Sequence, residues 1–242
     1  MGHFINSSPA VHFHNNNSIL FDGTNDHITI AGLTNDIATG AGTVSFWVKL
    51  DSTSANGAWF KASTDSSNQI AMTYVNGSTV FRPTYKAGGT AESVDIAFAF
   101  EGNDTWYHVA LTWDTAAAEG AGEMKAWKNG VQSGSTQAIA GTWSGSINTV
   151  TVGKNSLADN SYAAGHVSQL TVWKTALTAA QMLQLYNGEE GGPGNPLMNS
   201  NVANLIGWYG FNEGSGTSVT DLSGTGNTAT LVNGAAFNTD TP

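Results

Sequence analysis

Apolar and polar residues alternate strictly in two well-separated segments of the chain. In residues 44–50 and again in residues 107–113, every second residue is aliphatic or aromatic, and mostly short or polar residues stand between them. A period of two places successive side chains on opposite faces of an extended segment. The pattern therefore predicts two half-buried β-strands.

Asn-Gly pairs mark two hairpins between further short strands. Asn76-Gly77 and Asn129-Gly130 each stand between two short segments with strand character. This dipeptide tolerates the positive φ angles of a type I′ turn, which joins antiparallel strands. Many short strands separated by such turns predict an all-β sandwich or barrel.

One segment, Thr178–Asn187, has the pattern of a helix. Thr178 can cap its first turn, and Gln181 three residues later completes a capping box. Leu177 and Met182 have the spacing of a hydrophobic staple across this start. We expect one short helix, closing one end of the sandwich.

The chain divides into an arm and one domain. Residues 1–17 hold His3, His12 and His14 and read as an N-terminal arm, either an ordinary polar extension or a segment that docks on a partner. Residues 18–242 form the sandwich, and residues 197–242 are expected to supply its closing strands. A length of 242 residues fits one all-β domain.

Composition narrows the class of partner. The chain has 8 basic and 18 acidic residues, a net charge of −10, and no cysteine. Nucleic-acid binding depends on clustered Lys and Arg, so we expect no nucleic-acid partner and no anionic membrane partner. The absence of cysteine excludes disulfides and thiolate metal sites. The N-terminus lacks the basic and apolar regions of a secretion signal, and no apolar run reaches the length of a membrane helix.

Seven segments, in order along the chain, resemble the laminin-G-like jelly roll of the concanavalin-A-like lectin/glucanase superfamily. They are Leu20–Asp26, Val44–Lys49, Trp106–Asp114, Trp127–Val131, Gln169–Trp173, Ala176–Gln181 and Gly207–Phe211. The resemblance implies an all-β, two-sheet antiparallel jelly-roll sandwich. In many such modules the strand similar to Gly207–Phe211 comes first, whereas here it comes last. With the following Asp221–Gly224, this order resembles laminin-G-like proteins of tailed bacteriophages.

The resemblance implies a non-enzymatic virion surface protein, a capsid-decoration or accessory attachment subunit assembled in the host cytoplasm. Its partners would be other virion proteins, reached through residues 1–17, and host or environmental glycans. Such a module would act as a homo-oligomer or in many copies. Two alternatives stay open: an extracellular, stand-alone carbohydrate-binding lectin domain, and a glycosidase of the same superfold.

The carboxylates do not have the spacing of a glycosidase. Retaining hydrolysis needs two carboxyl groups about 5–5.5 Å apart, flanking the bond that is cut. The pairs Glu92/Asp95 and Glu119/Glu123 are wrongly spaced for one strand and lie in turn-rich sequence. No serine nucleophile elbow and no phosphate-binding loop is present. We therefore predict no catalytic residue.

A structural calcium ion is the metal that the sequence allows. Asp22, Asn25 and Asp26 bring three oxygen-bearing side chains into five residues around a glycine, and hard cations prefer oxygen ligands. Relatives in the superfamily often hold calcium near this segment. The acidic pair that usually completes the site is replaced by Ser168-Gln169. In the alternative, the two aspartates cap backbone N–H groups of a tight turn.

Trp59 and Trp143 are candidate sugar-binding platforms. Both lie among Gly, Ser and Ala residues, so we expect them to be exposed, and exposed aromatic rings can stack on sugars. Most other tryptophans stand in strand patterns and are expected in the core. His108, within a strand, is expected to be a hydrogen-bonded residue of the sandwich.

Overall fold

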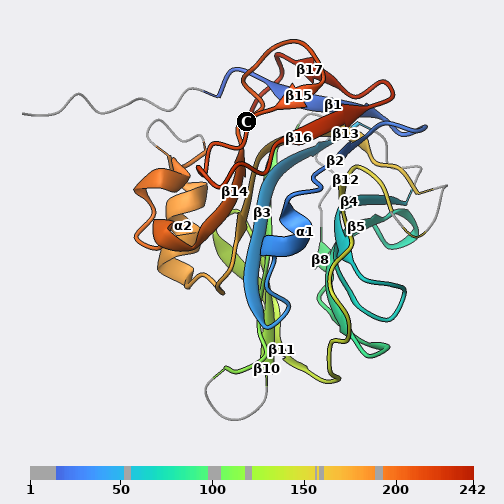
Figure 1. Cartoon of the computed structure of the whole chain (residues 1–242), viewed down its shortest axis with the longest axis vertical. Helices are drawn as coiled ribbons and strands as arrows, with labels where there is room; N and C mark the ends of the chain where they lie inside the picture. Colours follow the sequence, from blue (N-terminus) through green and yellow to red (C-terminus); the bar gives the residue numbers. More distant parts are fainter. Residues whose placement is uncertain are drawn as a thin grey trace, which may run out of the picture.

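The computed structural model describes residues 15–51, 56–97, 105–117, 122–155, 157, 161–188 and 193–242. Their strands form two antiparallel sheets that pack face to face (Figure 1). The predicted two-sheet antiparallel sandwich is therefore confirmed. Histidines 3, 12 and 14 lie outside the described residues.

Sheet A contains eight strands within the described residues, in the order β11-β10-β9-β3-β13-β1-β17, and β14 also pairs with β13. Their bounds are β1 Ser18–Asp22, β3 Ala41–Leu50, β9 Tyr107–Asp114, β10 Gly122–Lys128, β11 Val131–Ile139, β13 Ala164–Trp173, β14 Leu205–Tyr209 and β17 Ala236–Asn238. Strands β1 and β14 share one edge of β13, β1 along its first half and β14 along its second.

Sheet B contains nine strands in the same part of the chain, in the order β15-β16-β2-β12-β4-β5-β6-β7, and β8 also pairs with β6. Their bounds are β2 His27–Thr29, β4 Gly57–Ser63, β5 Gln69–Val75, β6 Val80–Ala87, β7 Thr90–Ser93, β8 Ile96–Ala97, β12 Thr149–Val152, β15 Ser218–Val219 and β16 Ala229–Val232.

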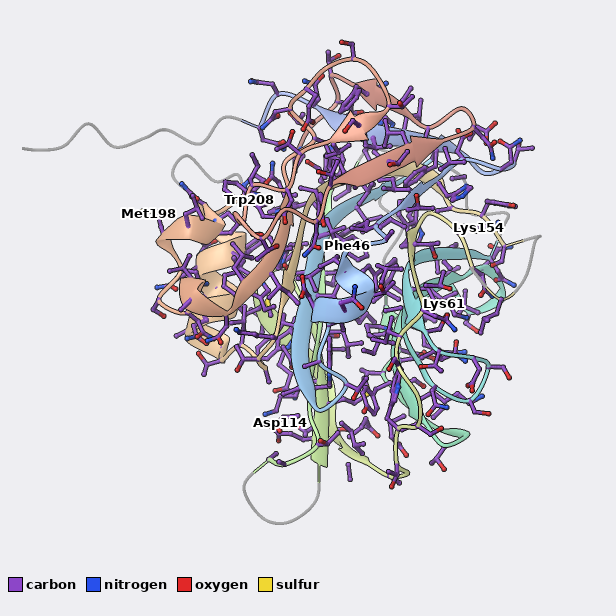
Figure 2. The ribbon with its side chains drawn as sticks, viewed as in Figure 1. Phe46, Lys61, Asp114, Lys154, Met198 and Trp208 are labelled. Atoms are coloured by element: carbon purple, nitrogen blue, oxygen red, sulfur yellow. The ribbon has the colours of Figure 1, made fainter. Side chains whose placement is uncertain are left out.

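Aromatic pairs join the two sheets through the main core. Phe46 of β3 meets Phe81 of β6 edge to face, with ring centroids 6.0 Å apart. Tyr85 of β6 lies 6.4 Å from Trp113 of β9. Offset and edge-to-face contacts of this kind add to the hydrophobic stabilisation of burial. Figure 2 shows Phe46 between the two sheets.

A second apolar cluster lies on the outer face of sheet A, under α2 (Ala179–Tyr186) and two 3-10 turns, η3 Pro196–Met198 and η4 Val202–Asn204. Trp127, Trp173 and Trp208 of the sheet pack there with Met182 and Leu185 of the helix. The predicted capping box is present, because Thr178 Oγ1 accepts from the Gln181 N–H and Gln181 Oε1 accepts from the Thr178 N–H.

This second layer corrects one expectation. The alternation in β3 and β9 correctly predicts which side chains face the main core, but the strands are not half-buried. Ser45, His108 and Thr112 point to the other face and are also buried, at 1%, 2% and 3% exposure. The helix layer covers them, and a periodic pattern does not reveal such a cover.

The two Asn-Gly hairpins differ from each other. Asn129 and Gly130 have φ values of 50° and 76° and join β10 to β11, as a type I′ turn requires. Asn76-Gly77 instead begins a four-residue loop, in which residues 76–78 form a 3-10 turn and Thr79 takes φ 49°. A further one-turn helix, α1 Leu33–Asp36, was not predicted; it bears Leu33 into the core between the sheets.

Strands from residues 197–242 belong to both sheets. β14 pairs with β13, β17 pairs with β1, and β16 pairs with β2. Asp221, which is 8% exposed, organises the loop between β15 and β16. Its carboxylate accepts from the N–H groups of Trp208, Ser223 and Asn227 and from the Thr225 hydroxyl. Although burial opposes ionisation, these hydrogen bonds leave the pKa of Asp221 below its usual value.

The described end of the predicted arm packs on the sandwich. Asn15 Oδ1 accepts from Ser168 Oγ at 3.2 Å and from Gln169 Nε2 at 3.0 Å, and the Asn16 N–H donates to Asn212 Oδ1. Ser168 and Gln169, which stand where an acidic pair was expected, thus hold the chain as it enters β1.

Replacing Asp221 should destabilise the fold strongly. We expect Asp221→Asn to lower the free energy of unfolding by about 2–4 kcal/mol, because an amide group cannot accept all four hydrogen bonds. The contribution of the carboxylate to the free energy of unfolding should be fully present above the pKa that Asp221 has in the unfolded chain. It should be lost as pH falls through the lower pKa that Asp221 has in the folded chain. Urea unfolding at neutral and acidic pH measures both effects. Asp65→Asn is the control, since Asp65 caps an exposed turn; equal losses in the two variants would contradict the assignment.

Candidate functional site

The two sheets differ in what covers their outer faces. α2 packs on sheet A, on the side away from sheet B (Figure 1). Within the described residues, no helix packs on the outer face of sheet B. Helix α1 lies between the sheets instead, in contact with β12 and β14. The outer face of sheet B therefore differs from that of sheet A in having no helix layer among the described residues.

A row of polar residues crosses this face at one level. Residues paired across neighbouring strands point to the same side of a sheet. The pairing joins Thr230, Thr29, Thr151, Lys61, Ala71, Thr84 and Ser93 into one such row. Its two ends are exposed and its centre is buried. The row offers mainly hydroxyl groups, which both donate and accept hydrogen bonds.

Half of the cationic side chains of the chain lie on or beside this face, namely Lys61, Arg82, Lys86 and Lys154. Arg82 is neutralised by Asp95, which accepts from its guanidinium at 2.6 and 2.8 Å. Lys86 donates to the backbone carbonyl of Ser66. Figure 2 shows Lys61 and Lys154 on the far side of sheet B from Phe46. With Arg82 neutralised, three cations remain on or beside this face in a chain of net charge −10.

Lys61 is the buried member of the set, with 4% exposure. Its ammonium group donates to Asn155 Oδ1 at 2.7 Å, and it forms no salt bridge with a described carboxylate. Burial, and secondarily the charge of Lys86, lower the pKa of Lys61 to about 8. The side chain is therefore charged at neutral pH but incompletely compensated.

The segment after β12 places an aromatic ring beside one of these cations, Lys154. Asn155 Oδ1 accepts from both Lys61 and the Leu157 N–H, which ties this segment to the sheet. Lys154 pairs with Tyr162 across the segment, and its ammonium lies 5.6 Å from the centre of the Tyr162 ring. Tyr162 is half-buried and also lies near His27. An aromatic face next to hydroxyl and ammonium donors is an arrangement that can hold a sugar ring.

The two predicted platforms lie elsewhere. Trp59 is 1% exposed and packs edge to face on Phe21 in the main core, so its expected exposure is wrong. A β-bulge between Ala58 and Phe60 accounts for the difference, since it turns both Trp59 and Phe60 inward. Trp143 is partly exposed, and its ring packs 5.9 Å from Tyr85. Its role as a platform stays a prediction.

Asp22 and Asp26, two of the three predicted calcium ligands, accept hydrogen bonds from backbone N–H groups. Asp26 Oδ1 accepts from the Gly234 N–H at 2.7 Å, and its Oδ2 accepts from the Asp22 N–H at 3.1 Å. Asp22 Oδ1 in turn accepts from the Thr24 N–H. Among the described residues, no group of three or more His, Cys, Asp or Glu side chains is placed to hold a metal. These hydrogen bonds agree with the turn-capping alternative, and the calcium site stays a prediction.

Ser18, His166 and Asp51 meet in an order that resembles a catalytic triad. Ser18 Oγ lies 3.3 Å from His166 Nδ1, and His166 Nε2 lies 3.5 Å from Asp51 Oδ1. Ser18, however, is fully buried within β1, between β13 and β17. A nucleophile must reach its substrate, so this set holds strands together and does not form an active site.

Sequence reasoning missed the cations of sheet B, although part of the signal is visible. Arg82, Thr84 and Lys86 alternate with the buried Phe81 and Tyr85 along β6, a pattern typical of a strand with one polar face. The pairing of Lys61 with Asn155 joins positions 94 residues apart, which no local pattern reveals.

Comparison with known proteins places the chain in a family. Residues 22–182, about two thirds of the chain, match the Concanavalin A-like lectin/glucanases superfamily. The chain belongs to this superfamily. No curated protein sequence matches it significantly.

Solved structures share the fold of this superfamily member. A protein of Bacteroides ovatus that is proposed to bind carbohydrate aligns over 94% of the chain and 60% of its own, with a TM-score of 0.63 and 16% identity. Domain 4 of the Geobacillus stearothermophilus arabinanase AbnA, solved with arabinotriose, aligns over 70% and 76%, with a TM-score of 0.55 and 19% identity. The CBM40 module of the Ruminococcus gnavus IT-sialidase, solved with α2,6 sialyllactose, aligns over 69% and 95%, with a TM-score of 0.54 and 13% identity. At these identities the likeness shows the fold alone.

The described helices of this superfamily member are short. None has the length and the apolar character that crossing a membrane requires.

A calcium titration separates the two interpretations of Asp26. If Asp26 caps the turn, Asp26→Asn should lower the free energy of unfolding by about 1–3 kcal/mol with or without calcium, because its amide cannot accept from both N–H groups. Asp22→Asn, at an exposed position where an amide also caps, should cost much less. Thermal unfolding in chelator and in millimolar calcium provides the measurement. A calcium-dependent rise in melting temperature that Asp26→Asn removes would establish the metal site instead.

Proposed function

We propose that this chain is a non-enzymatic glycan-binding module and that it uses the outer face of sheet B. The observation that carries the proposal is the row of hydroxyl-bearing residues on that face, exposed at its two ends, together with the nearby cations and the Tyr162 ring. Two structural neighbours, the arabinanase domain and the sialidase module, were solved with oligosaccharides bound. Their shared fold supports the class of ligand, while the residues above belong to this chain.

The charge of the face favours glycans that bear a carboxylate. Burial and the charge of Lys86 disfavour the charged state of Lys61, and Lys61 has no described carboxylate partner. An anionic sugar would supply the missing counter-charge. A neutral sugar would offer the Lys61 ammonium group only uncharged hydrogen-bond acceptors. Because Lys61 is buried, its charge is weakly screened by solvent.

A module of this size gains effective affinity from repetition. Shallow glycan sites bind weakly one at a time, and many linked copies convert weak contacts into avidity. We place the module on the surface of a bacteriophage virion, as a capsid-decoration or accessory attachment subunit assembled in the host cytoplasm. The order of its segments, with the Gly207–Phe211 strand last, supports that setting. A stand-alone extracellular lectin is the alternative.

Binding assays on variants of the face test the site. We expect Tyr162→Ala and Lys86→Gln each to weaken binding to an oligosaccharide found by glycan array at least about fivefold, as loss of a contact residue commonly does. Lys174→Gln is the control, since Lys174 is exposed just after β13, in the other sheet. Calorimetric titration of the purified chain measures the affinities. Unchanged binding in both variants would place the ligand elsewhere, and no array ligand would contradict glycan binding.

The pH dependence tests the charge of Lys61. Its pKa of about 8 means that the charge is present at neutral pH and lost as pH rises through about 8. The preference for sialyllactose over lactose should therefore fall between about pH 7 and about pH 9. Lys61→Gln, which can still donate to Asn155, should show the low preference at both values. A preference that is independent of pH and of this substitution would show that Lys61 does not set selectivity.

Copy number on particles tests the virion setting. We expect the chain to co-purify with phage particles in many copies, and deletion of residues 2–14 to abolish attachment while leaving the fold intact. This deletion keeps Asn15, which packs on β13. Quantitative mass spectrometry of particles and circular dichroism of the truncated protein supply the readouts. Particles that carry no copies would favour the stand-alone lectin.

A further inference from the structure

Strand β13 contains a bulge under the helix layer. Its pairing with β3 is regular up to Ser168 opposite Trp47 and resumes at Thr171 opposite Ser45. Between them Gln169 takes a φ of 51°, and Leu170 points into the main core. A bulge of this kind bends the strand and breaks the regular spacing of side chains on the face above it.

A small cavity lies at the bulge, between sheet A and the helix layer. From the sheet it is lined by Ser45, Trp47, His108, Gln169 and Thr171, and from the layer by Leu185, Gly194 and Pro196. Its volume of about 10 Å³ corresponds to one water molecule. None of the lining side chains carries a permanent charge, so the cavity does not favour an ion.

Two lining residues each have a nitrogen without a partner. Trp47 Nε1 and His108 Nδ1 are buried and form no hydrogen bond with any described residue. The two residues are direct cross-strand neighbours, with ring centroids 5.6 Å apart. Leaving a buried polar group without a hydrogen-bond partner is unfavourable, because the group has lost its contacts with water.

The other tryptophans of this face show that such unpaired groups are exceptional here. The indole N–H of Trp127 donates to Thr112 Oγ1, that of Trp173 to Thr171 Oγ1, and that of Trp208 to Gln169 Oε1. Trp47 alone among these four lines the cavity and lacks a protein acceptor.

Hydroxyl groups at the cavity supply one further donor. Thr171 Oγ1 already accepts from Trp173, and it shares a 2.7 Å hydrogen bond with Ser45 Oγ. Two hydroxyl hydrogens are present, and that shared bond uses one. Whichever group donates in it, the other keeps a hydrogen for which the described residues show no acceptor.

The imidazole of His108 is neutral. Complete desolvation lowers its pKa to about 3. A neutral imidazole has one nitrogen that accepts and one that donates. Its Nδ1 can therefore accept a hydrogen bond from a molecule in the cavity.

We propose that the cavity binds one small neutral molecule that both donates and accepts hydrogen bonds, and that this molecule is water. Its oxygen accepts from Trp47 Nε1 and from the free hydroxyl of the Ser45–Thr171 pair, and one of its hydrogens goes to His108 Nδ1. Three partners are typical of a buried structural water. The site is separate from the glycan face, because it lies on the opposite sheet.

A crystal structure at about 1.5 Å resolution tests the proposal directly, since waters with several partners are well ordered. We expect a density peak within hydrogen-bond distance of Trp47 Nε1 and His108 Nδ1. In solution, the Trp47 indole proton should show a cross-relaxation peak to a long-lived water, and the Trp127 indole proton should not. An empty cavity, or a side chain rotated so that Trp47 meets a protein acceptor, would overturn the proposal.

Matched variants identify the contact. Trp47→Phe removes the unpaired donor, and the crystal structure of this variant should show no water in the cavity. Trp127→Phe removes an indole N–H that already has a protein acceptor, and it should keep the water. Retention of the water in both variants would show that Trp47 does not hold it, and the wild-type measurements decide the proposal if Trp47→Phe fails to fold.

Discussion

The central strands of sheet A, β3, β9, β13 and β14, are buried on both faces, and this constraint governs much of the structure. A sheet with one solvent-exposed face can leave its polar side chains in contact with water. The central strands of sheet A cannot, so their polar side chains need hydrogen-bond partners within the protein. Thr43, for example, donates to the Thr175 carbonyl and accepts from the Leu177 N–H, which fixes the chain just before α2. The helix layer is thus attached by specific hydrogen bonds as well as by its apolar cluster.

Sheet B has no helix layer among the described residues, so solvent reaches parts of its outer face. Its outer side carries threonines and cations, which tolerate water and can also bind polar ligands. The chain has few other positive groups that could compete for an anionic ligand. Sheet A therefore packs against a helix layer, whereas no described helix covers the outer face of sheet B.

Local signals in the sequence predicted local structure well. The Thr178 capping box and the Asn129-Gly130 turn depend on residues a few positions apart, and both are present. The predicted exposure of Trp59 was wrong because a β-bulge changes the face of the sheet to which its side chain points. No feature of the sequence marks that bulge. The cover over Ser45 and the contact of Lys61 with Asn155 depend on segments far apart in the chain. Of the candidate site, only the alternation in β6 could be read in advance.

The pairing of β1 with β17 has a consequence for how such a module can be combined with others. Ser18 is the direct partner of Asn238, so the two ends of the sandwich lie side by side at one edge of sheet A (Figure 1). A domain whose ends are adjacent can be inserted into a loop of another protein, or joined in a circularly permuted order, without stretching either chain.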